Sequence, residues 1–231
     1  MDEANSKLVA VLAGGSGLVG SELLKEMLED GPIVHIYAMT RSPLPFVHSK
    51  LEIIENKDLH INNWEEPKPS PRLGFICLGT TQKQAGSSAN LEKVDYGLVC
   101  EVAQTMKLLG VTHLSVVSSY GASPNSPSHY LRCKGKMEIA LSGMGFERLL
   151  FVRPGPLSGL RDSPRKSEQV TLGLLNYLKP IMIGPLKNLI PIDAKHVALA
   201  MLFGLLEPSL KKHTTLHSVD ILTLLKKFQN L

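Results

Sequence analysis

The sequence predicts an α/β fold built on a doubly wound parallel sheet of about seven strands, and three observations favour it. Short apolar segments alternate with amphipathic segments over most of residues 7–152. Several of the short segments are apolar on both faces, as in LVAVLA at 8–13, which is typical of strands covered by helices on both sides. A glycine-rich turn, AGGSGLVG at 13–20, follows the first of them.

The elements come in the order strand, helix, strand, which makes right-handed βαβ units. The turn at Gly31-Pro32 ends the first helix, and Asn90 is a candidate N-cap for a long helix with one apolar face. We therefore expect strands at 7–13, 33–39, 51–54, 73–78, 113–117 and 148–152, and helices at 18–28, 90–109 and 129–144.

The residues after Pro154 contain more loops. Helices are expected near 169–178, 194–206 and 220–229, with Asp193 as the cap of the second. We expect a single domain over 1–231, in which 155–231 contribute a small substrate lobe. A basic loop could close over an anionic substrate or simply be solvated; it holds Arg161, Arg165 and Lys166.

Composition argues against two classes of partner. The net charge of +4 comes without a dense stripe of Lys and Arg, so we expect no nucleic acid. The longest apolar run, 197–206, is too short to cross a bilayer, so we expect no membrane partner. The polar start MDEANSK does not resemble a secretory signal, and a cytoplasmic protein is expected.

The cysteines and histidines give no metal signal. Cys77, Cys100 and Cys133 lie far apart without a C-x-x-C pair, which argues against a zinc site or a disulfide framework and fits a reducing compartment. His213 and His217 have the i,i+4 spacing of metal ligands. HTTLH is rich in β-branched residues, however, and has no carboxylate between the histidines. We expect no metal site.

The turn at 13–20 has the pattern of a nucleotide-binding loop, since Gly14, Gly17 and Gly20 give G-x-x-G-x-x-G and Gly15 completes G-x-G-x-x-G. Glycines let the chain turn sharply and approach a pyrophosphate, which the positive end of a helix attracts. The turn joins a buried strand to a helix, so we expect cofactor contacts from Gly14, Gly15, Ser16, Gly17, Leu18, Val19 and Gly20. The alternative is a structural turn without a ligand.

The end of the second strand indicates which cofactor is bound. Arg41 stands where an NAD-preferring protein carries Asp or Glu. A carboxylate repels a 2′-phosphate, whereas a guanidinium binds it, and Ser42 adds a hydroxyl donor. We expect NADP(H), with a solvated surface arginine as the alternative. After the third strand come Asp58 and Leu59, where Asp58 could accept from the adenine amino group or cap a turn.

The fifth strand and the next helix carry candidate catalytic residues: Ser119, Tyr130 and Lys134. Alone, a Tyr and a Lys spaced i,i+4 are more often a surface pair. The fifth strand ends, however, at the carboxyl edge of the sheet, where ligands of open α/β folds bind. A cation close to the phenol lets tyrosine transfer protons, and a serine hydroxyl can bind the substrate carbonyl oxygen. We therefore expect these three residues to be catalytic.

Further motifs fit these assignments, and together they resemble a known family. They are ICLGTTQKQAGS (76–87), KVDYGLV (93–99), HLSVVSSYGA (113–122), YLRCKGKMEIAL (130–141) and FVRPGPL (151–157). The chain resembles the short-chain dehydrogenase/reductases, and within them the atypical, NADP-binding Tat-interacting-protein-like oxidoreductases. The resemblance runs over residues 7–200 and implies an NAD(P)-binding Rossmann fold, similar to that of NAD-dependent epimerases and dehydratases.

The resemblance also implies site residues. Tyr130 and Lys134 match the family's Y-x-x-x-K, and Pro154 and Gly155 match the turn that faces the nicotinamide carboxamide. The loop after the fourth strand is expected along the cofactor, with contacts from Leu78, Gly79 and Thr80.

The chain also departs from the family pattern at two places. The interval from Ser119 to Tyr130 is short for the family, which leaves Ser118 as the alternative serine. Asp95 stands where many relatives carry Asn, so a role in proton relay is left open.

Two functions from different classes follow. The first is an NADP(H)-dependent oxidoreductase acting on a small carbonyl or alcohol substrate, with Tyr130 as general acid/base. The second is a non-enzymatic NADPH-sensing regulatory protein that acts through protein contacts, so a protein partner or a homo-oligomer is left open. A nucleotide-sugar epimerase is disfavoured because residues 156–231 leave little room for a sugar-binding domain.

Overall fold

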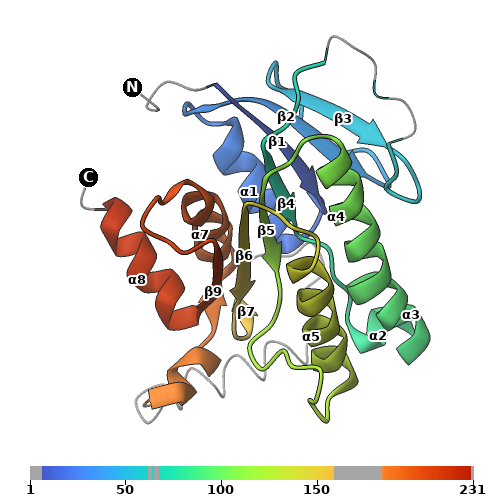
Figure 1. Ribbon diagram of the computed structural model, residues 1–231, viewed down its shortest axis with the longest axis vertical. Helices are drawn as coiled ribbons and strands as arrows, with labels where there is room; N and C mark the ends of the chain where they lie inside the picture. Colours follow the sequence, from blue (N-terminus) through green and yellow to red (C-terminus); the bar gives the residue numbers. More distant parts are fainter. Residues whose placement is uncertain (1–6, 62–63, 65–67, 159–183, 230–231) are drawn as a thin grey trace.

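The computed structural model describes residues 7–61, 64, 68–158 and 184–229. Seven parallel strands form one sheet in the order β3-β2-β1-β4-β5-β6-β9, which confirms the predicted α/β doubly wound fold (Figure 1). The strands are β1 (Leu8–Ala13), β2 (Ile33–Thr40), β3 (Leu51–Glu55), β4 (Leu73–Ile76), β5 (His113–Val117), β6 (Arg148–Arg153) and β9 (His213–His217). The strand order reverses direction between β1 and β4, and ligands of such sheets bind beyond the carboxyl ends at that point.

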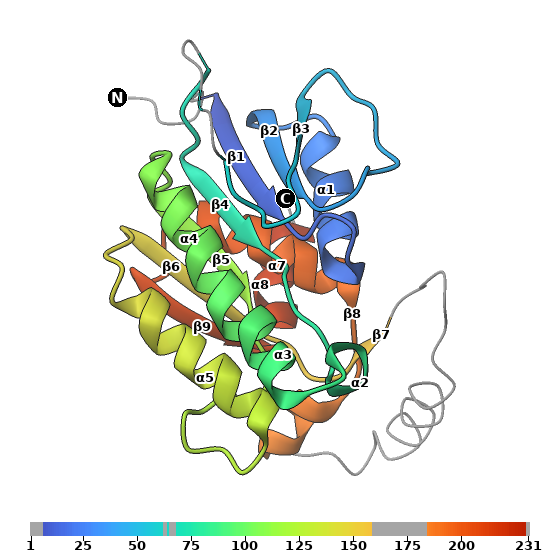
Figure 2. The ribbon, with the colours of Figure 1, turned by 90° about the vertical axis from the view of Figure 1, so that its right-hand side faces the viewer.

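Helices cover both faces of the sheet (Figure 2). One face packs against α1 (Leu18–Leu28), α7 (Ala194–Leu206) and α8 (Ser218–Gln229), and the other against α4 (Val99–Leu108) and α5 (His129–Ser142). Each face has its own hydrophobic core, and neighbouring β1 residues serve both: Leu12 belongs to the first core and Val11 to the second. This explains why β1 is apolar on both faces.

The helix expected at 90–109 consists of three segments: α3 (Ser88–Glu92), a π-helical turn at Lys93–Leu98, and α4. A separate four-residue helix, α2 (Gln82–Ala85), precedes them. Asn90 is not the N-cap as predicted, because the Ser87 hydroxyl accepts from the Asn90 backbone N–H at 3.1 Å and starts the helix earlier. The π turn inserts extra backbone without breaking the helix, so apolar spacing alone does not reveal it.

The described residues after Pro154 contribute one strand to the main sheet and also form short elements of their own. β7 (Leu157–Ser158) and β8 (Ile192–Asp193) make a short parallel pair, and a 3₁₀ helix spans Gly184–Leu189. Asp193 caps α7 as predicted, accepting from Lys195 N–H at 2.7 Å. The HTTLH segment forms β9 beside β6. The predicted helix at 169–178 and the basic residues Arg161, Arg165 and Lys166 lie outside the described residues.

Among the described residues, every helix is too short or too polar to cross a bilayer. The loops that carry most of the predicted site residues leave the carboxyl ends of β1, β4, β5 and β6.

Candidate active site

The glycine-rich turn passes tightly against the loop after β4. Gly14 has φ +90°, and a Cβ there would lie 2.8 Å from the Cys77 carbonyl. A Cβ on Gly20 would lie 2.0 Å from the Gly14 oxygen, so only glycine fits either position. Among the described residues no side chain caps the start of α1, and its N–H groups and positive end are available to an anion. The backbone of residues 14–20 therefore fits a dinucleotide pyrophosphate.

The residues expected at the adenosine half lie after β2 and β3. Arg41 and Ser42 are exposed, and the backbone there is fixed by Thr40, whose hydroxyl donates to the Ser42 carbonyl at 2.6 Å. Asp58 is exposed in a turn closed by the Asn56 side chain, which accepts from Asp58 N–H at 2.9 Å. Leu59 is buried with φ +55° and packs in the core under β2.

Lys134 is buried, 2% exposed at its side chain, and its ammonium contacts three separate parts of the chain. Nζ lies 2.9 Å from Asp95 Oδ1, 3.3 Å from the Val117 carbonyl oxygen and 3.4 Å from the Leu78 carbonyl oxygen. Burial lowers the pKa of Lys134, but Tyr130, Asp95 and Glu138 raise it by more, so that the pKa is raised overall. Lys134 is therefore a fixed cation between α5, the loop after β4 and the end of β5.

The sequence left open whether Asp95 has a role in proton relay, and in the structure Asp95 lies at the centre of this site. It lies in the π turn, is fully buried, and its Oδ2 accepts from the Thr80 backbone N–H at 2.9 Å. Its Oδ1 faces Lys134 as an ion pair but accepts no well-aligned hydrogen bond from the described residues. Asp95 thus connects Lys134 to the loop that is expected along the cofactor.

The two candidate serines have different surroundings. Ser118 is buried, and its hydroxyl donates to Glu138 on α5. Glu138 in turn pairs with the Arg153 guanidinium, with Nε 2.9 Å from Oε1. Ser119 is half-buried, and within the part of the chain that the structure describes its hydroxyl makes one long contact, 3.4 Å to the Tyr120 carbonyl. The geometry favours Ser119 as the serine that can reach a ligand.

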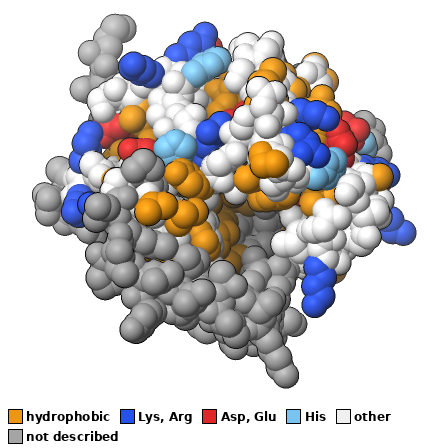
Figure 3. All heavy atoms as spheres, turned by 90° about the horizontal axis from the view of Figure 1, so that it is seen from below, with side chains coloured by type: hydrophobic (Ala, Val, Ile, Leu, Met, Phe, Trp, Pro, Cys, Tyr) orange, Lys and Arg blue, Asp and Glu red, His pale blue; other side chains and the backbone are white. Residues whose placement is uncertain are grey.

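A cleft of about 290 Å³ lies beside Ser119 and is lined also by Tyr120, Pro154, Gly155, Pro156 and Leu189. The Tyr120 N–H donates to the Pro154 carbonyl and the Gly155 N–H donates to Ser218 Oγ, each at 2.9 Å. Seen from the carboxyl ends of the strands, hydrophobic side chains gather around a hollow in this face (Figure 3). Tyr130 is half-buried on the first turn of α5.

The network of Ser118, Glu138 and Arg153 was missed from the sequence. A signal existed, because Glu138 follows Lys134 by one helical turn and Arg153 directly precedes Pro154. The network ties α5 to the ends of β5 and β6, and so fixes the backbone on both sides of Ser119 and Pro154.

The comparisons with known proteins add a family. No family model matches the chain. A curated relative from the yeast Meyerozyma guilliermondii, "Protein FMP52, mitochondrial", is 34% identical over 202 residues, which cover 86% of this chain and 86% of the relative. The chain belongs to the FMP52 family. The FMP52 protein of Candida albicans is 33% identical over 193 residues, 80% of this chain and 82% of the relative.

Solved structures similar to this FMP52-family chain include an epimerase and a reductase domain. The UDP-N-acetylglucosamine 4-epimerase of Methanobrevibacter ruminantium has a TM-score of 0.64 at 17% identity, over 92% of this chain and 77% of that one. WbmH of Bordetella bronchiseptica, solved with NAD⁺, has a TM-score of 0.63 at 13% identity, over 91% of this chain and 75% of WbmH. The PhqB reductase domain of Penicillium fellutanum has a TM-score of 0.64 at 15% identity, over 91% of this chain and 67% of the PhqB chain. At these identities the likeness shows the Rossmann fold that NAD(P)-binding epimerases and reductases share.

The expected cytoplasmic location is wrong. The FMP52 relatives carry "mitochondrial" in their names. The polar start of the chain argued only against a secretory signal, and such a test does not separate the cytosol from the mitochondrion.

Proposed function

We propose that this FMP52-family chain is an NADP(H)-dependent oxidoreductase that reduces a small carbonyl compound or oxidises the corresponding alcohol. The observation that carries the proposal is the buried Lys134 ammonium, 2.9 Å from Asp95 and one helical turn from Tyr130. A fixed cation near a phenol supports proton transfer by tyrosine. The resemblance to the Tat-interacting-protein-like oxidoreductases agrees with this function, and the names of the relatives support a mitochondrial setting.

The cofactor is NADP(H) bound along the carboxyl edge of the sheet. The backbone of Gly14–Gly20 takes the pyrophosphate, since a Cβ at Gly14 or Gly20 would collide with backbone there. Arg41 and Ser42, both exposed, take the 2′-phosphate. Asp58 and Leu59 lie on the adenine side, and the nicotinamide side is formed by Leu78, Gly79, Thr80, Pro154 and Gly155.

The protein's own groups handle the proton. When bound, NADPH supplies the hydride. Tyr130 gives its hydroxyl proton to the substrate oxygen as negative charge develops there, and Ser119 donates a hydrogen bond to the same oxygen. Lys134 keeps its charge because Asp95 accompanies it into the interior, and its ammonium, which contacts the Leu78 and Val117 carbonyls, would hold the loop after β4 in place beside the cofactor. The substrate enters the cleft beside Ser119.

The cofactor assignment is tested by calorimetric titration with NADPH and NADH. We expect NADPH to bind at least about tenfold tighter, a difference near 1.4 kcal/mol, and Arg41→Asp to reverse the order. Arg72→Asp is the matched control, because Arg72 is also exposed but lies where β4 begins, at the opposite edge of the sheet. Equal affinities of the parent protein for both cofactors would contradict the assignment.

The chemistry is tested by NADPH consumption with a panel of aldehydes, ketones and quinones. Tyr130→Phe and Lys134→Met should each lower turnover by about 10²–10⁴. Lys134→Met should also weaken NADPH binding, whereas Tyr130→Phe should not. Lys136→Met is the control, since Lys136 is on the same helix with its side chain 49% exposed. A parent protein that binds NADPH tightly and turns over no substrate would favour the sensing function instead.

A further inference from the structure

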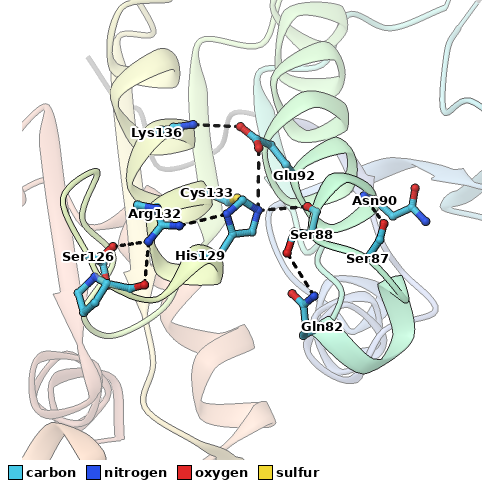
Figure 4. Close-up of polar contacts among 11 residues, drawn as sticks. Gln82, Ser87, Ser88, Asn90, Glu92, Ser126, His129, Arg132, Cys133 and Lys136 are labelled. Atoms are coloured by element: carbon cyan, nitrogen blue, oxygen red, sulfur yellow. Dashed lines mark hydrogen bonds and ion pairs between the residues drawn. The ribbon is translucent and has the colours of Figure 1, made fainter.

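A cluster of metal-ligating side chains lies where α3 meets the first turn of α5 (Figure 4). Glu92 comes from the end of α3, and His129 and Cys133 lie one turn apart on α5. One ligand atom of each residue lies within 4.8 Å of the other two. Cys133 is buried while Glu92 and His129 are partly exposed, so the thiol lies at the base of a cluster that solvent can reach.

The spacing suits tetrahedral coordination. His129 Nε2 lies 3.6 Å from Cys133 Sγ and 3.9 Å from Glu92 Oε2. Zinc–ligand bonds of about 2.0–2.3 Å at tetrahedral angles place neighbouring ligand atoms roughly 3.3–3.6 Å apart. The nitrogen and sulfur already meet this spacing, and Glu92 Oε2 is about half an ångström farther from His129 Nε2 than the spacing requires. Lys136 pairs with the other carboxylate oxygen, Oε1, at 3.0 Å and leaves Oε2 facing His129.

We propose that Glu92, His129 and Cys133 bind a divalent transition metal of the zinc class. Thiolate, imidazole and carboxylate together suit zinc or cobalt, whereas magnesium and calcium take oxygen ligands. The Ser88 carbonyl oxygen lies 3.1 Å from His129 Nε2 and can supply the fourth ligand, or a water can. The bound metal joins α3 to the first turn of α5, one residue from Tyr130.

Binding changes the protons of two ligands. Without metal, Arg132 Nη2 lies 3.4 Å from His129 Nδ1, and because arginine only donates, Nε2 carries the proton that faces Ser88. Metal binding moves that proton to Nδ1 and ends the long Arg132 contact. Arg132 keeps its bonds to the Ser126 and Pro127 carbonyls at 2.8 and 2.7 Å. The Cys133 thiol proton is released to solvent.

Metal affinity should therefore fall as the pH is lowered. The metal binds the Cys133 thiolate and must displace the thiol proton. At lower pH the proton therefore competes more strongly with the metal for the sulfur.

The test is a titration of chelator-treated protein with Co²⁺, followed by Zn²⁺, in the absence of NADPH. We expect one equivalent of Co²⁺ to give a thiolate-to-cobalt charge-transfer band and the visible bands of four-coordinate cobalt, and Zn²⁺ to remove both. Cys133→Ser should abolish the charge-transfer band. His129→Ala should weaken binding by more than about a hundredfold, since losing even an outer-shell partner costs 10–100-fold. Cys100→Ser is the matched control, a half-buried thiol on α4 outside the cluster.

Two results would overturn the site: a parent protein without the thiolate band at one equivalent of Co²⁺, or a band that survives in Cys133→Ser. Should Cys133→Ser fail to fold, His129→Ala decides, because His129 is partly exposed and its removal leaves no core cavity. The measurement needs neither cofactor nor turnover, so its outcome is independent of the proposed reductase function.

Discussion

A lysine ammonium that is fully removed from water must be accompanied by an anion, or it loses its proton or destabilises the fold. For Lys134 that anion is Asp95, which is itself 0% exposed. Because both members of the pair are buried, each is costly to keep without the other. The pair is therefore open to a stability test that does not depend on turnover.

At neutral pH, Asp95→Asn should lower the free energy of unfolding by about 3–5 kcal/mol, the usual effect of leaving one buried charge unpaired. Urea denaturation measures this. The double variant Asp95→Asn/Lys134→Met should recover part of the loss, because it removes the remaining charge. A single variant as stable as the parent would mean that the pair is open to water.

The same pair has a pH signature. The folded-state pKa of Lys134 is raised above the ordinary value of 10.5, so its contribution to stability is fully present below pH 10.5 and is lost as the pH rises through the folded-state pKa. The stability difference between the parent and Asp95→Asn should therefore narrow above pH 10.5. Denaturation at a series of alkaline pH values checks the sign.

The two serines should separate stability from turnover. Ser118→Ala removes a buried donor to Glu138 and should cost about 1–3 kcal/mol of stability with turnover largely retained. Ser119→Ala should leave stability nearly unchanged and lower turnover, because Ser119 lines the cleft. If Ser118→Ala lowered turnover and Ser119→Ala lowered stability, Ser118 would be the serine that acts in turnover.

At the scale of elements, the π turn at Lys93–Leu98 decides which side chain faces the sheet edge. Asp95 is buried in that turn while neighbouring Lys93 is exposed. A π turn of this kind is often found at functional sites. Here it delivers a carboxylate to Lys134 from a helix that is otherwise regular.

Two glycine variants test the elements beside the site. Gly97 lies in the π turn, and among the described residues no atom beyond the turn's own backbone and the two chain neighbours lies within 4 Å of the position that a Cβ would take there. Gly97→Ala should therefore stabilise the protein by about 0.4–1 kcal/mol. Gly20→Ala should instead destabilise it and weaken NADPH binding, because its Cβ would lie 2.0 Å from the Gly14 oxygen. Thermal denaturation with and without NADPH distinguishes the two.

Most elements could be predicted because a buried parallel strand needs apolar residues on both faces and a helix needs them at i, i+3 and i+4. β1 and α1 follow these rules closely. The π turn could not be predicted, since one inserted residue leaves the apolar spacing of Val94, Leu98 and Val102 readable as one helix. The ion pair of Asp95 and Lys134 joins residues far apart in the chain, and only the assembled sheet brings them together.

At the scale of the whole molecule, the predicted cofactor site draws on loops from both halves of the sheet, after β1, β2, β3, β4 and β6. A ligand that contacts all of them binds the folded chain and not the unfolded one. NADPH at a hundred times its dissociation constant should therefore stabilise the fold by about 2.7 kcal/mol. Calorimetric unfolding should show a concentration-dependent rise in the melting temperature, and Tyr130→Phe should keep it. A melting temperature that does not change with the NADPH concentration would contradict the predicted cofactor site.

The pairing of β6 with β9 has a consequence for synthesis of the chain. β6 ends at Arg153 and its neighbour β9 begins at His213, so a ribosome must add residues 154–212 before that side of β6 finds its hydrogen-bonding partner. Until then a nascent chain presents an unpaired strand edge, which invites pairing with other chains. Contacts between segments this far apart in the sequence also form slowly relative to local contacts. Docking of β9 is thus a late event, and chaperones that hold newly made chains have their clearest task at this edge.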